Sequence, residues 1–172
     1  MKDYLNSKLY FFDQLIKKGG EIISDANIPQ IKRIKKISLK KKLNLNLIFH
    51  KTKGIELLSH KFEKKKKILE ILFKKKKYKF ELNLIGKIQI KNILMAILAA
   101  SKSNIKFKKI INIITKIKPV EGRLENIGKI FNNSKVILDY AHTPDALELA
   151  LLNLKEQFPQ SDLSVVFGCG GN

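Results

Sequence analysis

The sequence VILDYAHTPDALELALLNLKEQFPQSDLSVVFGCGG occupies residues 136–171, and the fold class follows from it. Val136–Leu138 is a short apolar run typical of a buried strand, and Leu163–Phe167 is a second. Between them, Thr143 is a good helix N-cap and the proline after it suits the first helical position, so a helix is predicted to about Phe158. A strand, a helix and a strand over about 33 residues predict a parallel βαβ unit and an α/β fold.

The residues before this unit alternate between predicted helices and strands. Residues 3–18 have helical periodicity, and Gly19 and Gly20 supply a stop. Beyond them a lysine-rich region contains only short β-like runs. The predicted strands are 21–24, 45–49, 55–59 and 78–84, and the predicted helices are 90–100, which is apolar almost all round and therefore buried, and 106–118, which ends at Pro119. Because the βαβ unit stops one turn after its second strand, we expect its domain to be cut short.

One lysine of the first helix occupies an unusual place. At 100° per residue, Lys8 points into the middle of the apolar arc formed by Tyr4, Leu5, Leu9, Phe11, Phe12, Leu15 and Ile16. An ammonium group buried there would be costly, so the side chain must reach solvent at the helix edge, lose its proton or be chemically altered. A carbamate formed with carbon dioxide would be an anion able to hold Mg²⁺. The helix by itself favours the first of these readings.

The charge of +20 raises the question of nucleic-acid binding, and its make-up argues against it. Of the 35 basic residues only Arg33 and Arg123 are arginine. The runs Lys64–Lys67 and Lys74–Lys77 flank apolar residues and lack the interleaved aromatic side chains that stack on single strands. We therefore expect these lysines to form solvated edges of a packed element, and no nucleic-acid partner.

The sequence also indicates where the protein resides. No run of 18 apolar residues is present, and the N-terminus has no signal-peptide pattern. Cys169 is the one cysteine, so the chain forms no internal disulfide. The apolar content is that of a globular protein. We expect a soluble, cytoplasmic protein without a membrane partner.

The first motif that carries chemistry is PVEGRLE at residues 119–125. In a chain that uses lysine almost everywhere, Arg123 indicates a site that needs a planar, bidentate fork, and phosphate is the usual partner of such a fork. A hinge with a surface ion pair between Arg123 and Glu125 explains the same residues equally well.

The second motif is DYAHTPD at residues 139–145. A carboxylate at the carboxyl tip of a parallel strand, just before a helix, lies where open α/β sheets bind ligands, so Asp139 is a candidate for ribose hydroxyls. Alternatively, Asp139 and His142 tie down the loop. The glycine-rich turn at residues 168–171 can approach phosphate closely, although it lacks the GxGxxG pattern, and Cys169 has no thiol or metal partner nearby.

Taken in order, these motifs resemble the Mur ligase family. DYAHTPDAL followed by VFGCGGN (residues 139–147 and 166–172) is similar to the branch that adds diaminopimelate. The other matching stretches are PVEGRLE, LIGKIQIKN at residues 84–92 and DYLNSKLYFF at residues 3–12. The resemblance spans nearly the whole chain and is weakest over about residues 28–80.

The resemblance implies a domain organisation and a set of site residues. Residues 1–118 would be the back part of the central ATPase domain, and residues 119–172 the truncated start of a Rossmann-like C-terminal domain. Lys8 would be a carbamylated lysine associated with Mg²⁺. Gln89 and Asn92 would lie at the adenine of ATP, although Gln89 replaces the family's usual asparagine. Arg123 and Asp139 would contact ATP from the C-terminal domain, with His142 beside them.

The implied activity is amide ligation in peptidoglycan synthesis. ATP would activate the carboxylate of UDP-MurNAc-L-Ala-D-Glu as an acyl phosphate, and the amine of diaminopimelate would attack it, by a monomeric enzyme. The family's phosphate loop and its diamino-acid motif are not in these residues, so the fragment alone is expected to be inactive. The alternatives are a sister ligase (lysine-adding or folylpolyglutamate synthase-like), a non-catalytic remnant, and a basic nucleic-acid-binding protein.

Overall fold

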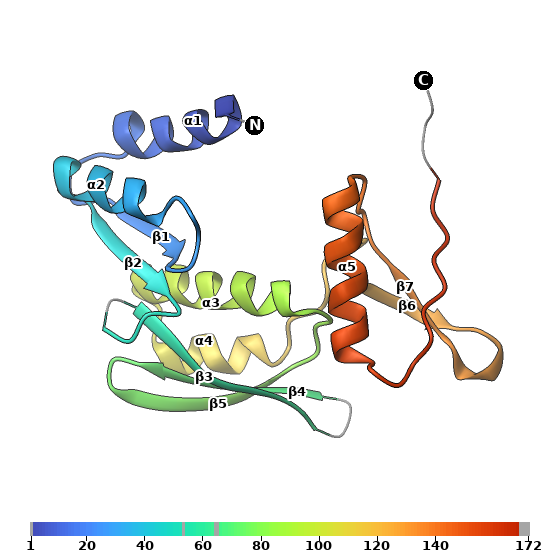
Figure 1. The fold of residues 1–172 in the computed structure, drawn as a ribbon. Helices are drawn as coiled ribbons and strands as arrows, with labels where there is room; N and C mark the ends of the chain where they lie inside the picture. Colours follow the sequence, from blue (N-terminus) through green and yellow to red (C-terminus); the bar gives the residue numbers. More distant parts are fainter. Residues whose placement is uncertain (1, 53, 64–65, 169–172) are drawn as a thin grey trace.

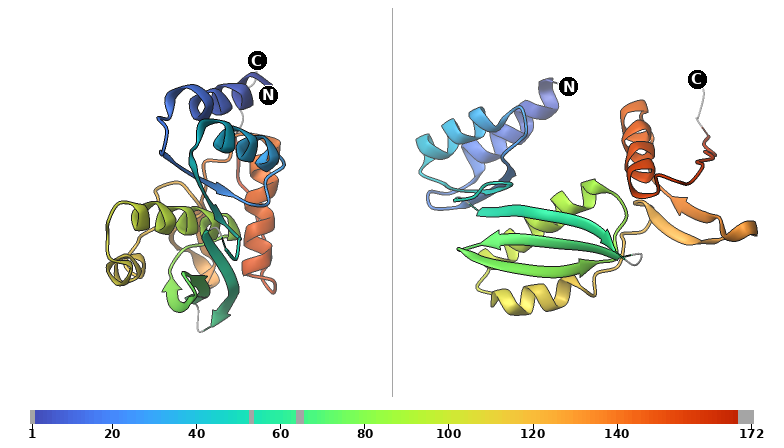
Figure 2. Two further views of the ribbon diagram at one scale, coloured as in Figure 1. Left: turned by 90° about the vertical axis from the view of Figure 1, so that its left-hand side faces the viewer. Right: turned by 60° about the horizontal axis from the view of Figure 1, so that its bottom comes forward.

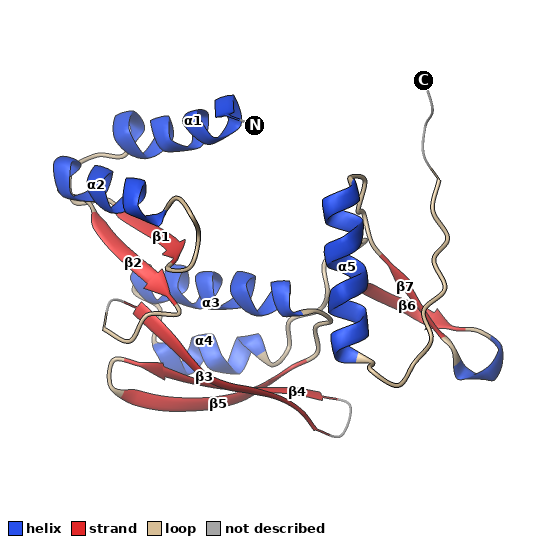
Figure 3. Ribbon diagram, viewed as in Figure 1, coloured by secondary structure: helices blue, strands red, loops and turns tan. Residues whose placement is uncertain are grey.

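The computed structural model describes residues 2–52, 54–63 and 66–168, which form an α/β fold (Figures 1 and 3). The helices are α1 (Lys2–Tyr10), the π-helical turn η1 (Phe11–Leu15), α2 (Ile31–Lys41), α3 (Lys87–Lys102), α4 (Phe107–Ile114), the 3-10 turn η2 (Phe131–Asn133) and α5 (Pro144–Gln157). The strands are β1 (Glu21–Asp25), β2 (Asn44–Ile48), β3 (Gly54–Glu63), β4 (Lys66–Phe73), β5 (Lys76–Leu82), β6 (Glu125–Lys129) and β7 (Lys135–Leu138).

The larger sheet is mixed and has the order β1-β2-β3-β4-β5. β1, β2 and β3 run parallel, whereas β3, β4 and β5 form an antiparallel meander. The β2–β3 pairing is short, from Leu47 opposite Gly54 to Ile48 opposite Ile55. A Cβ atom on Gly54 would lie 1.8 Å from the carbonyl oxygen of Leu47, so only glycine permits this close approach.

The main core lies between this sheet and the helices α3 and α4 (Figure 2). As the nearly all-apolar sequence of residues 90–100 predicts, α3 is buried, through Ile90, Ile93, Leu94, Ile97 and Leu98. On α4, Phe107 stacks on Phe73 of β4 with ring centres 4.4 Å apart, which ties the helix to the meander.

A second, smaller core joins α1 and α2 to β1, with Leu9, Ile22, Ile34 and Leu43 at its centre. The lysine-rich sequence around residues 31–41 does not predict α2. The helix is secured by only two buried residues, Ile34 and Ser38, one turn apart. Lys42 then ends it in a left-handed conformation, with φ +54°. The lysines keep their charged ends in solvent, which leaves only these two buried positions to indicate a helix.

The C-terminal segment partly contradicts the prediction. β6 and β7 pair antiparallel, with a bulge between Asn126 and Gly128. Residues 163–167 form no strand, and Val166 is fully exposed. The predicted parallel βαβ unit is therefore wrong for the described residues. A strand exists only where a neighbour accepts its hydrogen bonds, and the apolar run of 163–167 lies beside none in this part of the chain.

Helix α5 confirms the predicted cap and extent. The Thr143 hydroxyl accepts a hydrogen bond from the Ala146 N–H at 3.3 Å, and Pro144 begins the helix. The helix ends at Gln157, one residue before the predicted end. Of the glycine-rich turn only Gly168 is described, so Cys169 and the residues that follow it lie outside the described part.

The two lysine runs differ in their surroundings. Lys74–Lys77 are exposed at the β4–β5 hairpin, as predicted. Lys67, in contrast, is buried on β4, so the expectation of a solvated edge is wrong there. Among the described residues no helix is both long and apolar enough to cross a membrane.

Candidate nucleotide site

The hinge segment and the loop after β7 are fixed to each other. One carboxylate oxygen of Asp139, Oδ2, accepts a hydrogen bond from the Leu124 N–H at 2.8 Å. The Arg123 guanidinium lies 5.2 Å from the centre of the Tyr140 ring, and this ring meets the His142 imidazole edge to face at 5.3 Å. The predicted site residues Arg123, Asp139 and His142 therefore belong to one cluster. Tyr140 contacts both Arg123 and His142 and follows Asp139 in the chain.

The hinge turn leaves Arg123 available for a ligand. The Glu125 carboxylate accepts a hydrogen bond from the Gly122 N–H at 2.8 Å, which stabilises the turn at Gly122 with its φ of +65°. Among the described residues no salt bridge joins Glu125 to Arg123, so the predicted surface ion pair is not formed. Arg123 is exposed, and Tyr140 holds its guanidinium by a cation–π contact.

The loop reading of Asp139 and His142 is also partly supported. His142 Nδ1 lies 3.1 Å from the Tyr140 carbonyl oxygen, a contact that stabilises the loop between β7 and α5. Asp139 follows an antiparallel strand, so the argument from the tip of a parallel strand does not apply to it. Its placement beside Arg123 instead comes from the Leu124 hydrogen bond.

The second part of the candidate site is the first half of α3. The Asn92 amide nitrogen lies 3.5 Å from the Gln89 amide oxygen, so the two side chains adjoin on one face of the helix. Between them in sequence, the Lys91 ammonium lies 2.9 Å from Oδ2 of Asp25, a carboxylate that is only 5% exposed. Asp25 was not among the predicted site residues, although it lies at the carboxyl end of the parallel strand β1, the position that the sequence indicated for Asp139.

These two parts meet at the N-terminus of α3. Gly86, the residue before the helix, packs against Leu124, because a Cβ atom built on Gly86 would lie 2.5 Å from the Leu124 side chain. Leu124 is 3% exposed, and its N–H is the one held by Asp139. A continuous set of contacts therefore runs from the Asp139 loop to the helix that carries Gln89. Figure 1 shows α5 standing beside this end of α3.

Lys8 does not occupy the buried place predicted for it. Leu5, Leu9, Phe12 and Ile16 pack into the second core, whereas Lys8 is exposed. Its ammonium lies 4.4 Å from the centre of the Tyr4 ring. The apolar residues do share one side of the helix, but the described residues cover only half of that side. Lys8 lies on the uncovered half together with Tyr4, Phe11 and Leu15, each of which is more than half exposed. The prediction of a buried Lys8 is therefore wrong, and its exposure leaves it accessible to carbon dioxide.

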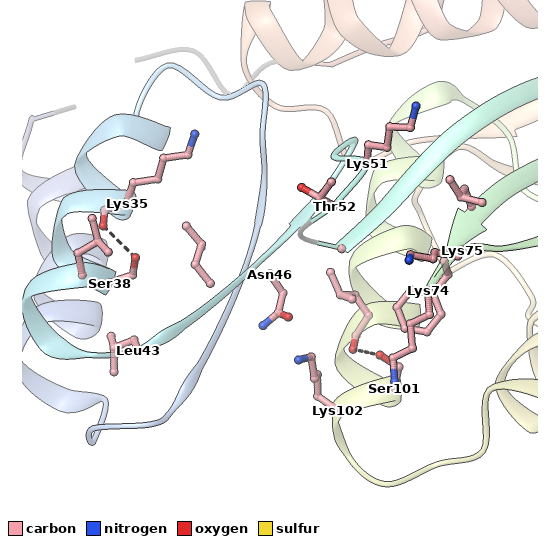
Figure 4. A pocket seen from close by; sticks show the side chains of 16 residues that line it. Lys35, Ser38, Leu43, Asn46, Lys51, Thr52, Lys74, Lys75, Ser101 and Lys102 are labelled. Carbon is pink, nitrogen blue, oxygen red and sulfur yellow. Dashed lines mark hydrogen bonds between the residues drawn. The ribbon is translucent and has the colours of Figure 1, made fainter.

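A cavity of about 820 Å³ lies elsewhere, between α2 and the C-terminal end of α3 (Figure 4). Five lysines line it (Lys35, Lys51, Lys74, Lys75 and Lys102), together with the buried Asn46. Lys102 is partly neutralised by Glu21, with 3.5 Å between Nζ and Oε2. None of the residues predicted to bind the nucleotide lines this cavity.

The candidate site fits a nucleotide better than a metal ion. Side-chain amides such as those of Gln89 and Asn92 both donate and accept, which matches the edge of adenine, and an exposed arginine fork matches phosphate. The described residues contain no group of three His, Cys, Asp or Glu side chains able to hold a metal ion. A carbamate on Lys8 would supply at most its two oxygens to Mg²⁺, so most of the octahedral coordination of the ion would have to come from other groups.

Comparison with protein families divides the chain in two. The family model described as the Mur ligase middle domain matches residues 1–100, and that of the Mur ligase glutamate ligase domain matches residues 122–172. A UDP-N-acetylmuramoyl-L-alanyl-D-glutamate–2,6-diaminopimelate ligase of Rickettsia bellii is 36% identical over 99% of this chain, and that of Zymomonas mobilis is 33% identical over 100% of this chain. The chain spans about 35% of each of these relatives.

Solved structures show the same fold. MurF from Acinetobacter baumannii superposes with a TM-score of 0.75 at 13% identity, over 94% of this chain and 34% of that one. A diaminopimelate ligase structure gives 0.69 at 19% identity, over 90% of this chain and 32% of that one. Folylpolyglutamate synthetase from Lactobacillus casei gives a TM-score of 0.68 at 17% identity, over 92% of this chain and 40% of that one. At these identities the likeness concerns the fold alone.

Proposed function

Because the chain belongs to the Mur ligase family, we propose that the protein containing it joins 2,6-diaminopimelate to UDP-MurNAc-L-Ala-D-Glu at the expense of ATP. The substrates come from the names of relatives that are 36% identical over nearly all of this chain. The observation that carries the nucleotide part is the hydrogen bond between Asp139 and the Leu124 N–H, which sets Arg123 beside the end of α3.

In this proposal ATP supplies the phosphoryl group that activates the acceptor carboxylate. Residues 1–118 and 119–172 are parts of the central and C-terminal domains, and the nucleotide lies where they meet. Gln89 and Asn92 hold the adenine through their amides. Arg123, held against Tyr140, binds phosphate oxygens, and Asp139 orients the segment that carries Arg123. Lys8, as a carbamate, contributes an oxygen ligand for Mg²⁺.

A sister activity of the folylpolyglutamate type remains a second candidate, since the fold is shared. Relatives named as diaminopimelate ligases match 99% of the chain at up to 36% identity, and this favours diaminopimelate.

The two arginines of the chain provide a test with a matched control. In a chimaera, residues 1–172 replace the matching third of the Rickettsia bellii ligase, and amide formation is followed at varied ATP. Arg123→Ala should raise the KM for ATP or lower kcat about ten- to a hundredfold, since a charge-assisted contact contributes roughly 1.5–3 kcal/mol. Arg33→Ala, which removes an exposed arginine 3.5 Å from Asn6 on α1, should leave both constants unchanged. Equal kinetics for both variants would refute the nucleotide role.

A further inference from the structure

Helix α3 begins without a cap of its own. Its N-cap residue is Gly86, which has no side chain, and its first turn contains no acidic residue. A helix N-terminus leaves N–H groups without partners inside the helix, and leaving them unsatisfied in a buried place is costly. Gly86 is buried, so water does not readily replace the missing cap.

Two side chains of α5, some 70 residues later in the chain, bind these groups instead. Gln157 Oε1 accepts a hydrogen bond from the Gly86 N–H at 2.8 Å. Asn153 Oδ1 accepts from the Lys87 N–H and, at 3.4 Å, from the Ile88 N–H. Asn153 therefore acts as the N-cap of a helix to which it does not belong.

The orientation of the Asn153 amide is fixed within α5. Its nitrogen donates to the Leu149 carbonyl oxygen at 2.7 Å, one turn earlier, so its oxygen must face α3. Asn153 is only 6% exposed, and both ends of its amide have partners. A buried polar side chain satisfied in this way is rigid and fixes the geometry of the elements that it joins.

The surroundings leave little freedom for α3 to shift. Gly86 has φ +84°, a conformation that other residues rarely adopt, and a Cβ atom there would lie 3.2 Å from Asn153 Oδ1 as well as against Leu124. The Lys67 ammonium donates to the Gly86 carbonyl oxygen at 3.0 Å from the sheet side. The exposed pair of Lys87 with Glu156, at 2.9 Å, adds a contact that contributes little.

We infer that Asn153 is a positioning residue for the nucleotide: by capping α3 from α5, it sets Gln89 and Asn92 in place when the C-terminal segment is docked. This inference rests on the proposed adenine role of those two amides. Gln89 is two residues beyond Lys87, whose N–H Asn153 holds, so a shift of the first turn moves Gln89 directly. Docking of α5 is thereby coupled to the shape of the adenine site.

The test uses the 172-residue chain with adenosine as the probe, followed by NMR at the side-chain amide signals of Gln89 and Asn92. Asn153→Ala should weaken adenosine binding about five- to tenfold, the factor that corresponds to loss of one helix cap. Asn153→Asp keeps an acceptor oxygen for α3 and should bind adenosine within about twofold of the wild type. Amide exchange of Lys87 and Ile88 should quicken only in Asn153→Ala.

Asn46→Ala is the matched control. Asn46 is a buried asparagine that hydrogen-bonds the backbone of β1 and β2, so its loss destabilises the fold without removing any hydrogen bond to the first turn of α3. Adenosine affinity that falls in Asn153→Ala and persists in Asn46→Ala supports the inference. Equal affinity in wild type and Asn153→Ala, with loss in Gln89→Ala, would overturn the inference and leave the nucleotide site standing. No adenosine response at Gln89 or Asn92 in the wild type would overturn both.

Discussion

Lys67 should make the stability of the fold depend on pH in a range where few buried groups titrate. Burial on β4 lowers the pKa of Lys67 from 10.5 to about 8, and the carboxylate of Glu156 opposes this lowering. The difference between the two values corresponds to about 3 kcal/mol at most. This is the cost of keeping Lys67 charged in the folded state at pH 7.

The direction in which the unfolding free energy changes with pH depends on whether the folded or the unfolded chain holds the Lys67 proton more tightly. Between pH 8 and 10.5 the unfolded chain still binds the Lys67 proton and the folded chain has released it. The Lys67 contribution to the unfolding free energy therefore rises with pH across this window, and below pH 8 the cost is fully present. Lys67→Met removes the cost, and also the hydrogen bond to the Gly86 carbonyl oxygen, a loss of about 1 kcal/mol.

The net expectation is that Lys67→Met stabilises the chain by about 1–2 kcal/mol at pH 7 and loses this advantage by pH 10. Urea unfolding of the wild type and of Lys67→Met at pH 7, 8, 9 and 10 measures the difference between their unfolding free energies. The other lysines titrate in both proteins, so their effect cancels in this difference. Lys77→Met, the same change at an exposed position of β5, should give a small difference that stays constant with pH. A constant gap for Lys67→Met, or an NMR titration of Lys67 near 10.5, would refute the reasoning.

Three further outcomes are expected. The purified 172-residue chain should form no amide from UDP-MurNAc-L-Ala-D-Glu, diaminopimelate and ATP, since it contains no phosphate loop; product above a no-enzyme blank contradicts this. In the chimaera, Lys8→Met should lose most turnover with the fold intact, and Lys8→Ala should regain some turnover when formate fills the gap; an active Lys8→Met protein would return Lys8 to a surface role. Thr143→Ala should lower the unfolding free energy by about 1 kcal/mol, because the hydroxyl caps α5, and unchanged urea midpoints would rule the cap out.

The sequence predicted those elements whose signals are local. Thr143 and Pro144 predict the start of α5, and the apolar run of α3 predicts that this helix is buried. Both signals lie within a few residues of the feature that they predict. β1, β2, β3 and β5 were also located within a few residues of their observed ends. The likeness of DYAHTPDAL and the other motifs to Mur ligases was confirmed by two family models and by relatives that match 99% of the chain.

The errors concern properties that depend on distant partners. Residues 163–167 have the composition of a strand, but a strand also needs a neighbour. Lys8 shares its helical arc with apolar residues, but only the half of the arc that meets β1 and α2 is buried. Lys67 belongs to a run of lysines, yet the sheet places it against Gly86. Nothing local to Asn153 indicates that it caps a helix 66 residues earlier. Composition and periodicity contain no information on these contacts.

The contact between α5 and α3 also has a consequence for synthesis on the ribosome. The Gly86 N–H forms its hydrogen bond with Gln157, a residue made 71 residues later. The β4–β5 hairpin, in contrast, closes through the two adjacent residues Lys74 and Lys75. The five-stranded sheet and α3 can therefore assemble while the C-terminal segment is still being made. During that interval the first turn of α3 lacks the Asn153 cap, and the interval ends when α5 has left the ribosome and docked. The speed of translation after residue 87 therefore contributes to how long the uncapped end of α3 is exposed to proteases and chaperones.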